Sequence, residues 1–145
     1  MTDPTTLPPS RHAGDVQVDD ELPELSVPLT RTFIISAAIA SRDYQDVHHD
    51  HELAQQKGSA DIFTNILTSN GLVGRYITDW AGPASRLRKV AVRLGVPNYA
   101  GDTMVLTGRV TAVDDTTIEV AVRGRNSLGD HVTGTVTVEL PGADR

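Results

Sequence analysis

Apolar and polar side chains alternate in four separate runs along the second half of the chain. Turn-forming residues separate the runs, among them Pro97, the pair Asp114-Asp115, and Gly129. The four expected strands are residues 88–94, 103–113, 117–125 and 131–140. A period of two places every second side chain on the same face. Runs this closely spaced therefore predict an antiparallel sheet with one buried face.

One long helix is expected before these strands. Apolar residues recur at helical spacing from Ile62 to Trp80, and Gly82-Pro83 ends the pattern. Gly71 and Gly74 lie inside it, and each costs about 1 kcal/mol relative to alanine in a helix. Glycine is expected there if a backbone or ligand approaches closely. A curved sheet that wraps around the helix meets this condition.

Two further patterns precede the helix. The apolar, β-branched run at residues 32–40 is typical of a buried strand. Residues 43–56 are polar and rich in histidine, which predicts a tight turn and one or two short helices. The resulting order is strand, helix, then four strands. We therefore expect an α+β domain in which a curved antiparallel sheet wraps around one long central helix.

Charge divides the 145-residue chain into two parts. Residues 1–29 carry one arginine and six acidic residues, whereas the remainder has 12 basic and 13 acidic residues. Residues 1–28 are also rich in proline and threonine, which predicts a flexible acidic tail. Leu22, Leu25 and Val27 are candidates for docking near its end. The folded domain is expected at residues 29–145.

Composition excludes several classes of function. The chain has no cysteine, hence no disulfide framework, thiolate nucleophile or cysteine-bound zinc. The folded part has no basic stripe for nucleic acid. No run of 18 apolar residues and no signal-peptide pattern is present. A cytoplasmic protein without a membrane segment is expected.

Asp43 and His48 are the strongest candidates for catalysis. They lie five residues apart, and an acid and an imidazole that share one water can move its proton. On local sequence alone, Asp43 is equally well explained as a helix N-cap. His48, His49 and His51 do not have the spacing of a zinc hydrolase helix, so no metal is expected. His49 and His51 are interpreted as solvated turn residues.

The segment Arg42-Asp43-Tyr44-Gln45-Asp46-Val47-His48 resembles the signature of the MaoC-like, R-specific enoyl-CoA hydratases, which have the hotdog fold. That signature is Gly-Asp-x-Asn-Pro-x-His, so Arg42, Gln45 and Asp46 depart from it. Residues 98–103 resemble the family's Pro-Gly-Asp-Thr turn. The resemblance covers residues 30–140, and it implies that Asp43 and His48 hold the catalytic water.

The same resemblance implies a place for the thioester oxygen. In the family, a backbone N–H at the start of the central helix stabilises the oxyanion, because these N–H groups lack internal partners. Asn65 occupies that place here, where the family usually has glycine. Asn65 is also explained as a helix cap, and the two roles can coexist. The resemblance implies no cofactor, since CoA belongs to the substrate.

Further segments are similar to one branch of this family, the small subunits of heteromeric steroid enoyl-CoA hydratases in actinobacterial cholesterol degradation. They are residues 61–67, 78–83, 93–97 and 124–131. This similarity implies a steroid 20-carboxyl-CoA substrate. It also implies a larger partner with a MaoC-like and a DUF35 domain, a tetramer of two small and two large subunits, and contact with a thiolase-like aldolase through the partner.

Two other functions are compatible with the sequence. A hotdog thioesterase hydrolyses the thioester and typically places its acid on the central helix. Residues 62–78 contain no acidic residue, and Asp79 comes only at the end. A non-catalytic subunit that binds acyl-CoA or serves as a scaffold is the second alternative. The dyad residues argue against it, while the altered signature positions leave it open.

Overall fold

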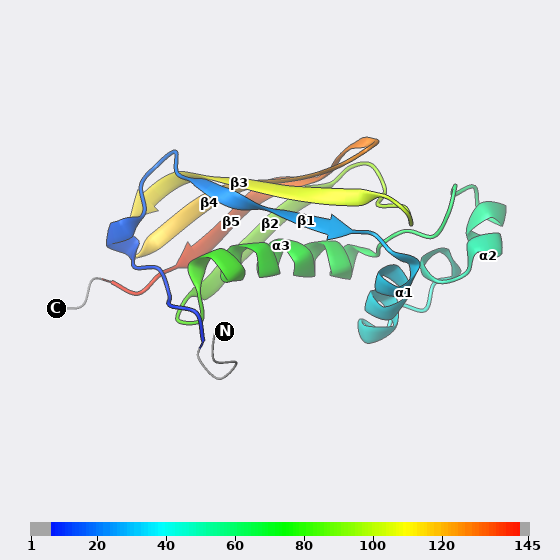
Figure 1. Cartoon of the computed structure of the whole chain (residues 1–145), viewed down its shortest axis with the longest axis horizontal. Helices are drawn as coiled ribbons and strands as arrows, with labels where there is room; N and C mark the ends of the chain where they lie inside the picture. The colour runs from blue at the N-terminus through cyan, green and yellow to red at the C-terminus, as the bar shows by residue number, and fades with distance from the viewer. Residues whose placement is uncertain (1–6, 143–145) are drawn as a thin grey trace, which may run out of the picture.

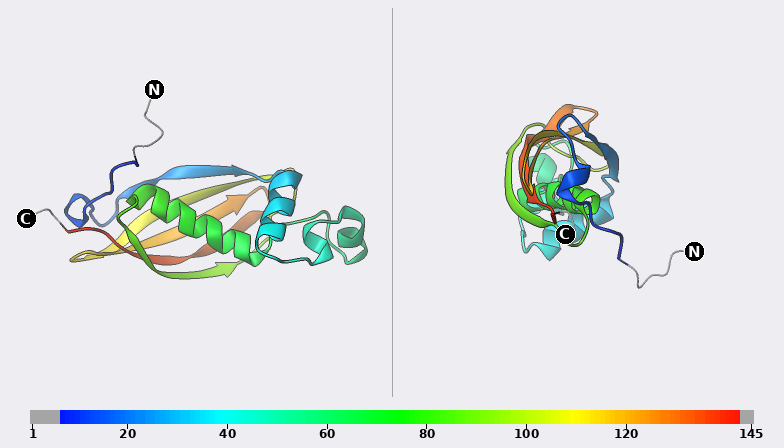
Figure 2. Two further views of the ribbon diagram at one scale, coloured as in Figure 1. Left: turned by 90° about the horizontal axis from the view of Figure 1, so that it is seen from below. Right: turned by 90° about the vertical axis from the view of Figure 1, so that its left-hand side faces the viewer.

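The computed structural model describes residues 7–142, which form a five-stranded antiparallel sheet curved around one long helix (Figure 1). The strands are β1 (Glu21–Pro28), β2 (Arg86–Leu94), β3 (Thr103–Asp114), β4 (Thr117–Asn126) and β5 (Gly129–Glu139). They lie in the order β1-β3-β4-β5-β2. The long helix is α3 (Ile66–Ala81). Figure 2 shows the sheet curling around this helix when viewed end-on. The hotdog architecture predicted from the sequence is confirmed.

The core lies between α3 and the concave face of the sheet. Inward-facing side chains of β3 and β4 alternate with exposed ones, as the period-two pattern predicts. Fully buried members of the core include Val73 and Ile77 on the helix, and Leu106, Val120 and Val136 on the strands. The four strands expected after the helix are therefore confirmed, with ends that differ from the prediction by at most two residues.

The first strand is not where the sequence pattern placed it. Residues 32–40, expected to be a strand, form helix α1 (Arg31–Ala40). The hydroxyl of Thr30 caps this helix by accepting a hydrogen bond from the N–H of Phe33 at 3.1 Å. Only Ile34 and Ala38 are buried, one turn apart on one side of the helix. One-sided burial satisfies a helix, whereas the apolar run alone suggested a strand buried on both faces.

The sheet's first strand comes from the expected acidic tail. β1 pairs with β3, and its Leu22 and Val27 are buried. Ahead of it, the N–H of Ala13 bonds the carbonyl of Pro141 at 3.0 Å. The predicted domain boundary at residue 28 is therefore corrected. Residues 1–6 of the predicted tail lie outside the described residues. The pairing of β1 is interrupted by a bulge between Leu22 and Leu25.

Two short helical elements follow α1, as predicted. They are the 3₁₀ turn η2 (Asp46–His48) and helix α2 (His51–Gln56). Asp61 connects this region to α1, because its carboxylate accepts hydrogen bonds from Arg31 at 2.7 and 3.0 Å and pairs with His51 at 2.9 Å. α1 and α2 lie together at the end of the molecule where α3 begins (Figure 1). No helix within residues 7–142 is both long and apolar enough to cross a membrane.

Candidate active site

Asp43 is held at the end of α1 by an unusual backbone turn. Arg42, which precedes it, adopts a left-handed conformation with φ of 57°. The family signature has glycine at this position, and glycine adopts such angles at little cost. The N–H of Asp43 then bonds the carbonyl of Ala38 at 2.9 Å. This turn directs the chain back over α1 and fixes where the Asp43 carboxylate lies.

The Asp43 side chain is not a helix cap. Its Oδ1 accepts the N–H of Gln45 at 3.3 Å, which is a local two-residue turn. Gln45 is the residue that precedes η2, and its side chain makes no capping bond. The capping explanation of Asp43 is therefore wrong. Its second oxygen, Oδ2, remains directed at other side chains.

His48 ends η2 and is buried. Its Nδ1 lies 2.7 Å from the carbonyl oxygen of Phe63, and the two rings pack edge to face with centroids 5.0 Å apart. A carbonyl oxygen only accepts, so Nδ1 must carry the proton of this bond. In the neutral imidazole, Nε2 then has a free lone pair. Phe63 thus fixes both the tautomer and the orientation of His48.

The lone pair of His48 faces the Asp43 carboxylate. Nε2 of His48 and Oδ2 of Asp43 are 3.4 Å apart, beyond the usual range of a direct hydrogen bond. Both atoms are acceptors when the imidazole is neutral. A water molecule can satisfy both, because it carries two O–H donors. The pair expected from the sequence therefore meets in space and has the geometry to hold one polarised water.

Asn65 connects the pair to the start of α3. Its Oδ1 caps the helix by accepting the N–H of Thr68 at 2.9 Å. Because the cap fixes the amide, Nδ2 is turned towards α1. There it donates to Oδ2 of Asp43 at 3.1 Å and to the hydroxyl oxygen of Ser41 at 2.8 Å. Asn65 is thus the helix cap that the sequence offered as one explanation, and it also orients Asp43.

A second buried network supports the same end of the helix. The hydroxyl of Ser69 lies 2.7 Å from Nε2 of His131, whose Nδ1 lies 2.6 Å from the carbonyl oxygen of Val96. By the same argument as for His48, Nδ1 of His131 donates and Nε2 accepts from Ser69. Burial lowers the pKa of His131, and the bond to Val96 opposes this only in part. The network links β5 to the first turn of α3.

An open apolar groove begins beside Asn65. It has a volume of about 440 Å³ and lies between α1 and α3. Its walls are formed mainly by small and apolar side chains: Phe33, Ala37, Ala40, Ser41, Leu67, Thr68, Gly71, Leu72 and Arg75. Ser41 and Thr68 both contact Asn65, so the groove starts where the Asp43–His48 pair is held. It can receive an apolar group attached to the reacting carbon.

His49, His51 and Arg88 of β2 have partners other than this pair. Nε2 of His49 bonds the carbonyl of Tyr44 at 3.1 Å, and His51 pairs with Asp61. Residues 7–142 contain no group of three or more His, Cys, Asp or Glu side chains placed to bind a metal. On β2, Arg88 forms an ion pair with Glu139. Such an ion pair is common on a strand face that is exposed to solvent.

Sequence reasoning identified Asp43, His48 and Asn65, and the structure brings these three together. It missed Ser41 and the carbonyl of Phe63, which hold Asn65 and His48 in place. A serine two residues before an acidic residue is a weak signal, and a backbone carbonyl leaves no trace in the sequence. The sequence shows that Arg42 replaces the glycine of the family signature. The positive φ of Arg42 shows why glycine suits that position.

Comparison with known proteins was made by sequence and by structure. No family model matches the chain. The beta subunit of the 3-oxo-4,17-pregnadiene-20-carboxyl-CoA hydratase of Mycobacterium tuberculosis (strain ATCC 25618 / H37Rv) is 57% identical over 119 residues, which cover 82% of this chain and 92% of that protein. A chain of the ChsH1–ChsH2 complex from Mycobacterium tuberculosis has a TM-score of 0.84 and 56% identity, over 86% of this chain and 98% of that one.

A more distant relative shares the fold. The R-hydratase PhaJ1 from Pseudomonas aeruginosa has a TM-score of 0.84 at 19% identity, covering 92% of this chain and 87% of that one. Identity at that level supports the fold alone. The identity of 57% to a hydratase beta subunit carries the family assignment. The chain therefore belongs to the MaoC-like enoyl-CoA hydratase family, as an enzyme subunit on the same branch as the mycobacterial beta subunit.

Proposed function

We propose that this chain is the catalytic subunit of a heteromeric hydratase that adds water to the side-chain double bond of a steroid 20-carboxyl-CoA thioester. The observation that carries this proposal is the Asp43–His48 pair. Nδ1 of His48 is occupied by the carbonyl of Phe63, so its Nε2 lone pair and Oδ2 of Asp43 face one shared position from 3.4 Å apart. A water at that position is oriented and polarised for attack.

The reaction balances with these two groups alone. The water oxygen forms a bond to the β-carbon, the carbon–carbon π bond breaks, and the α-carbon takes up a proton. One member of the pair accepts the proton that leaves the water, and the pair returns a proton to the α-carbon. With the double bond between ring D and the side chain, the product carries a 17-hydroxyl group.

The thioester oxygen gains negative charge during attack and needs stabilisation. The start of α3 lies beside Asp43 through Asn65, and the first N–H groups of a helix lack internal partners. Their partial positive charge favours an anion. We assign the oxyanion to the backbone N–H groups that begin at Asn65. The cap bond to Thr68 keeps these groups in place.

A second subunit completes the site in this proposal. The structural relative from Mycobacterium tuberculosis occurs in a complex of two subunits, ChsH1 and ChsH2. In this chain, Ile39 on α1 and Ile66 and Leu67 on α3 are more than half exposed beside the groove. Such an apolar surface supports a protein partner. The family resemblance suggests a larger MaoC-like/DUF35 subunit, two copies of each chain, and an aldolase bound through the partner.

The thioesterase alternative has weaker support. Helix α3 contains one acidic residue, Asp79, near its C-terminal end and thus far from the Asp43–His48 pair at its start. No acid of the central helix can then reach the thioester carbonyl. A non-catalytic subunit would not need a hydrogen bond from Nδ1 of His48 to the carbonyl of Phe63 that fixes the tautomer of the imidazole. The hydratase and the two alternatives predict different outcomes with the same substrate, so one experiment separates them.

The test uses this chain co-expressed with a MaoC-like/DUF35 partner and a steroid enoyl-CoA. A hydratase yields an intact thioester with the mass of one added water. A thioesterase yields free CoA instead, and a binding subunit leaves the substrate unchanged. Assembly is checked by size-exclusion chromatography, so that a failed complex is not mistaken for an inactive one. Release of CoA without hydration would overturn the proposal.

A further inference from the structure

Asp61 is a charged residue that the proposed reaction does not use. Its side chain is 18% exposed, and its carboxylate lies among several donors. Oδ1 accepts hydrogen bonds from Arg31 at 3.0 Å, from Nδ1 of His51 at 2.9 Å and from the N–H of Ile62 at 2.7 Å. Oδ2 accepts from Arg31 at 2.7 Å. A carboxylate offers about four acceptor positions, so these bonds occupy Asp61 and fix it firmly.

The bonds from Arg31 fix the start of the helix that leads to Asp43. Arg31 is the first residue of α1, and its two terminal nitrogens bond the two oxygens of Asp61. Such a bidentate pair fixes geometry as well as adding energy. The N–H of Asp43 bonds back to the carbonyl of Ala38 near the end of the same helix. A shift at Arg31 is therefore carried along the ten residues of α1, about 15 Å, to Asp43.

The bond from His51 fixes the segment that carries His48. His51 is the first residue of α2 and comes three residues after His48. Between them, the N–H of Asp50 bonds the carbonyl of Asp46 at 2.8 Å and closes a tight turn. A carboxylate only accepts, so Nδ1 of His51 carries the proton of its bond to Asp61. His48 is thus connected to Asp61 through one short turn.

The backbone that follows Asp61 carries the carbonyl that orients His48. Phe63 comes two residues after Asp61, and its carbonyl oxygen accepts the bond from Nδ1 of His48 at 2.7 Å. The N–H of Ile62, between them, bonds the Asp61 carboxylate and fixes the direction in which the chain leaves. Asn65, which holds the other member of the pair, follows two residues later. One carboxylate therefore connects the three segments that place the pair.

The negative charge of Asp61 strengthens these connections. Burial acts to raise the pKa of Asp61, but the bonds from His51 and Ile62 and the charge of Arg31 lower it overall. The carboxylate is therefore ionised near neutral pH. Hydrogen bonds to an ionised group are about twice as strong as bonds between neutral groups. Alanine at this position would leave the three segments without their shared anchor.

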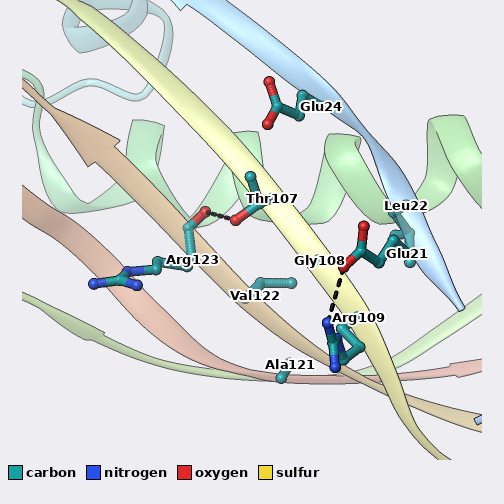
Figure 3. Close-up of a pocket in the computed structure, with 9 residues that line it drawn as sticks. All are labelled: Glu21, Leu22, Glu24, Thr107, Gly108, Arg109, Ala121, Val122 and Arg123. Carbon is teal, nitrogen blue, oxygen red and sulfur yellow. Dashed lines mark hydrogen bonds and ion pairs between the residues drawn. The ribbon is translucent and has the colours of Figure 1, made fainter. Parts of the chain in front are cut away.

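A second arginine that pairs with acids lies far from the site and provides a matched control. Arg109 of β3 forms ion pairs with Glu21 at 2.9 Å and with Asp19 at 3.6 Å. Figure 3 shows Glu21 and Arg109 paired on the wall of a cavity of about 470 Å³. Glu21 begins β1 at the end of the molecule opposite to α1 and α2 (Figure 1). The side chains of Arg109 and Arg31 are 55% and 54% exposed, so their removal disturbs the surface to a similar degree.

We propose that Asp61 is a positioning residue, which sets the separation of Asp43 and His48 by anchoring the three segments that place them. This inference rests on the proposed function and adds to it a residue that does not touch the reacting atoms. Without the anchor, the 3.4 Å approach of the pair is no longer held, and the position of the shared water changes with it. A misplacement of about 1 Å can lower a rate by about 100-fold. The effect of Asp61 is therefore expected in kcat.

The first experiment measures kcat and KM for hydration by assembled complexes that carry single substitutions. Asp61→Ala should lower kcat by at least about tenfold with little change in KM, because the placement of the pair is lost and no substrate contact is removed. Arg31→Met and His51→Phe should each give part of this loss. The combination of Arg31→Met with Asp61→Ala should be no slower than Asp61→Ala alone, since Arg31 acts through Asp61. Arg109→Met should hydrate at the wild-type rate.

A second measurement reports the placement of His48 without any turnover. The complex is assembled with ¹⁵N-histidine in this chain alone, and the imidazole N–H signals are recorded well below the melting temperature. The bond from Nδ1 of His48 to Phe63 should give a protected N–H signal, which His48→Gln identifies by its loss. The signal should weaken or vanish in Asp61→Ala and persist in Arg109→Met.

Each outcome decides the inference. Wild-type kcat in a folded and assembled Asp61→Ala complex would overturn it, and so would an equal loss in Arg109→Met. If Asp61→Ala does not assemble, Arg31→Met and His51→Phe replace it as the test, and wild-type kcat in both would overturn the inference. A wild-type complex that does not hydrate at all contradicts the proposed function instead. The His48 signal then decides the positioning role, which an unchanged signal in Asp61→Ala, or in both substitutes, would overturn.

Discussion

Asn65 offers a way to separate the support of a helix from the placement of the Asp43 carboxylate, which we propose to be catalytic. Its two amide atoms have different partners, since Oδ1 caps α3 through Thr68 and Nδ2 holds Asp43. Aspartate is as good an N-cap as asparagine. In Asn65→Asp, the capping oxygen is therefore kept, and the donor to Asp43 is replaced by an acceptor. Asn65→Ala removes both functions.

The size of the activity loss expected in Asn65→Asp follows from the contacts of Asn65. A hydrogen bond to a charged group contributes about 1.5–3 kcal/mol. In Asn65→Asp that bond is lost, and two carboxylates face each other where Nδ2 and Oδ2 are now 3.1 Å apart. Two unit charges at about that separation repel by at most roughly 5 kcal/mol at an effective dielectric constant of 20. If the displacement of Asp43 removes about 3 kcal/mol of transition-state stabilisation, kcat/KM falls by about 100-fold.

The assay follows loss of the enoyl thioester by absorbance, with melting temperature measured in parallel. Asn65→Asp should lose most activity and keep the cap, whereas Asn65→Ala should additionally lose about 1 kcal/mol of stability from the missing cap. Asn65→Ser is the matched control, because serine also caps and retains one donor. Wild-type hydration by Asn65→Asp would refute the reasoning that Nδ2 orients Asp43.

Three further predictions concern stability. Burial lowers the pKa of His131, so below about pH 6.5 the unfolded chain binds a proton that the folded chain does not bind. Stability should therefore fall as the pH drops below about 6.5. Urea midpoints measured across this range should show the fall, and His131→Gln should make them less dependent on pH. Burial of Asp61 acts to raise its pKa, but the bonds from His51 and Ile62 and the charge of Arg31 lower it overall. Its stabilisation is therefore present above about pH 4 and lost below, and Asp61→Asn should cost about 1 kcal/mol at pH 7 and nothing near pH 2; an equal cost at both values would contradict this. Gly71→Ala should raise stability by about 1 kcal/mol in chemical denaturation, since a Cβ at Gly71 meets no atom within 4 Å; a lower midpoint would contradict the open groove.

The sheet was predictable because four of its strands show the period-two pattern directly. The fifth, β1, was not, because it is an edge strand that carries Pro23 and exposed acidic residues. Edge strands tolerate proline and charge, so their composition resembles that of a tail. The apolar, β-branched run at residues 32–40 led to the opposite error, because it predicts a strand and forms helix α1. Its helical state depends on the cap at Thr30 and on packing through Ile34 and Ala38.

The site was predictable as far as its residues follow the family signature. Asp43 and His48 were identified by spacing, and Asn65 by its place before the helix. The 3.4 Å approach of the pair depends on the left-handed turn at Arg42 and on the carbonyl of Phe63. Nothing in the sequence indicates that the buried hydroxyl of Tyr76 has no hydrogen-bond partner among residues 7–142. Such features arise from tertiary packing.

The central claim is that Asp43 and His48 act together on one water. The most direct measurement is the hydration rate of the assembled complex carrying Asp43→Asn, His48→Ala, or both. Residues that act as a unit are not additive, so each single variant should lose at least about 1,000-fold in kcat and the double variant should be no slower than the worse single one. A double variant whose loss of kcat equals the product of the two single losses would contradict the account. A single variant that hydrates at the wild-type rate would also contradict it.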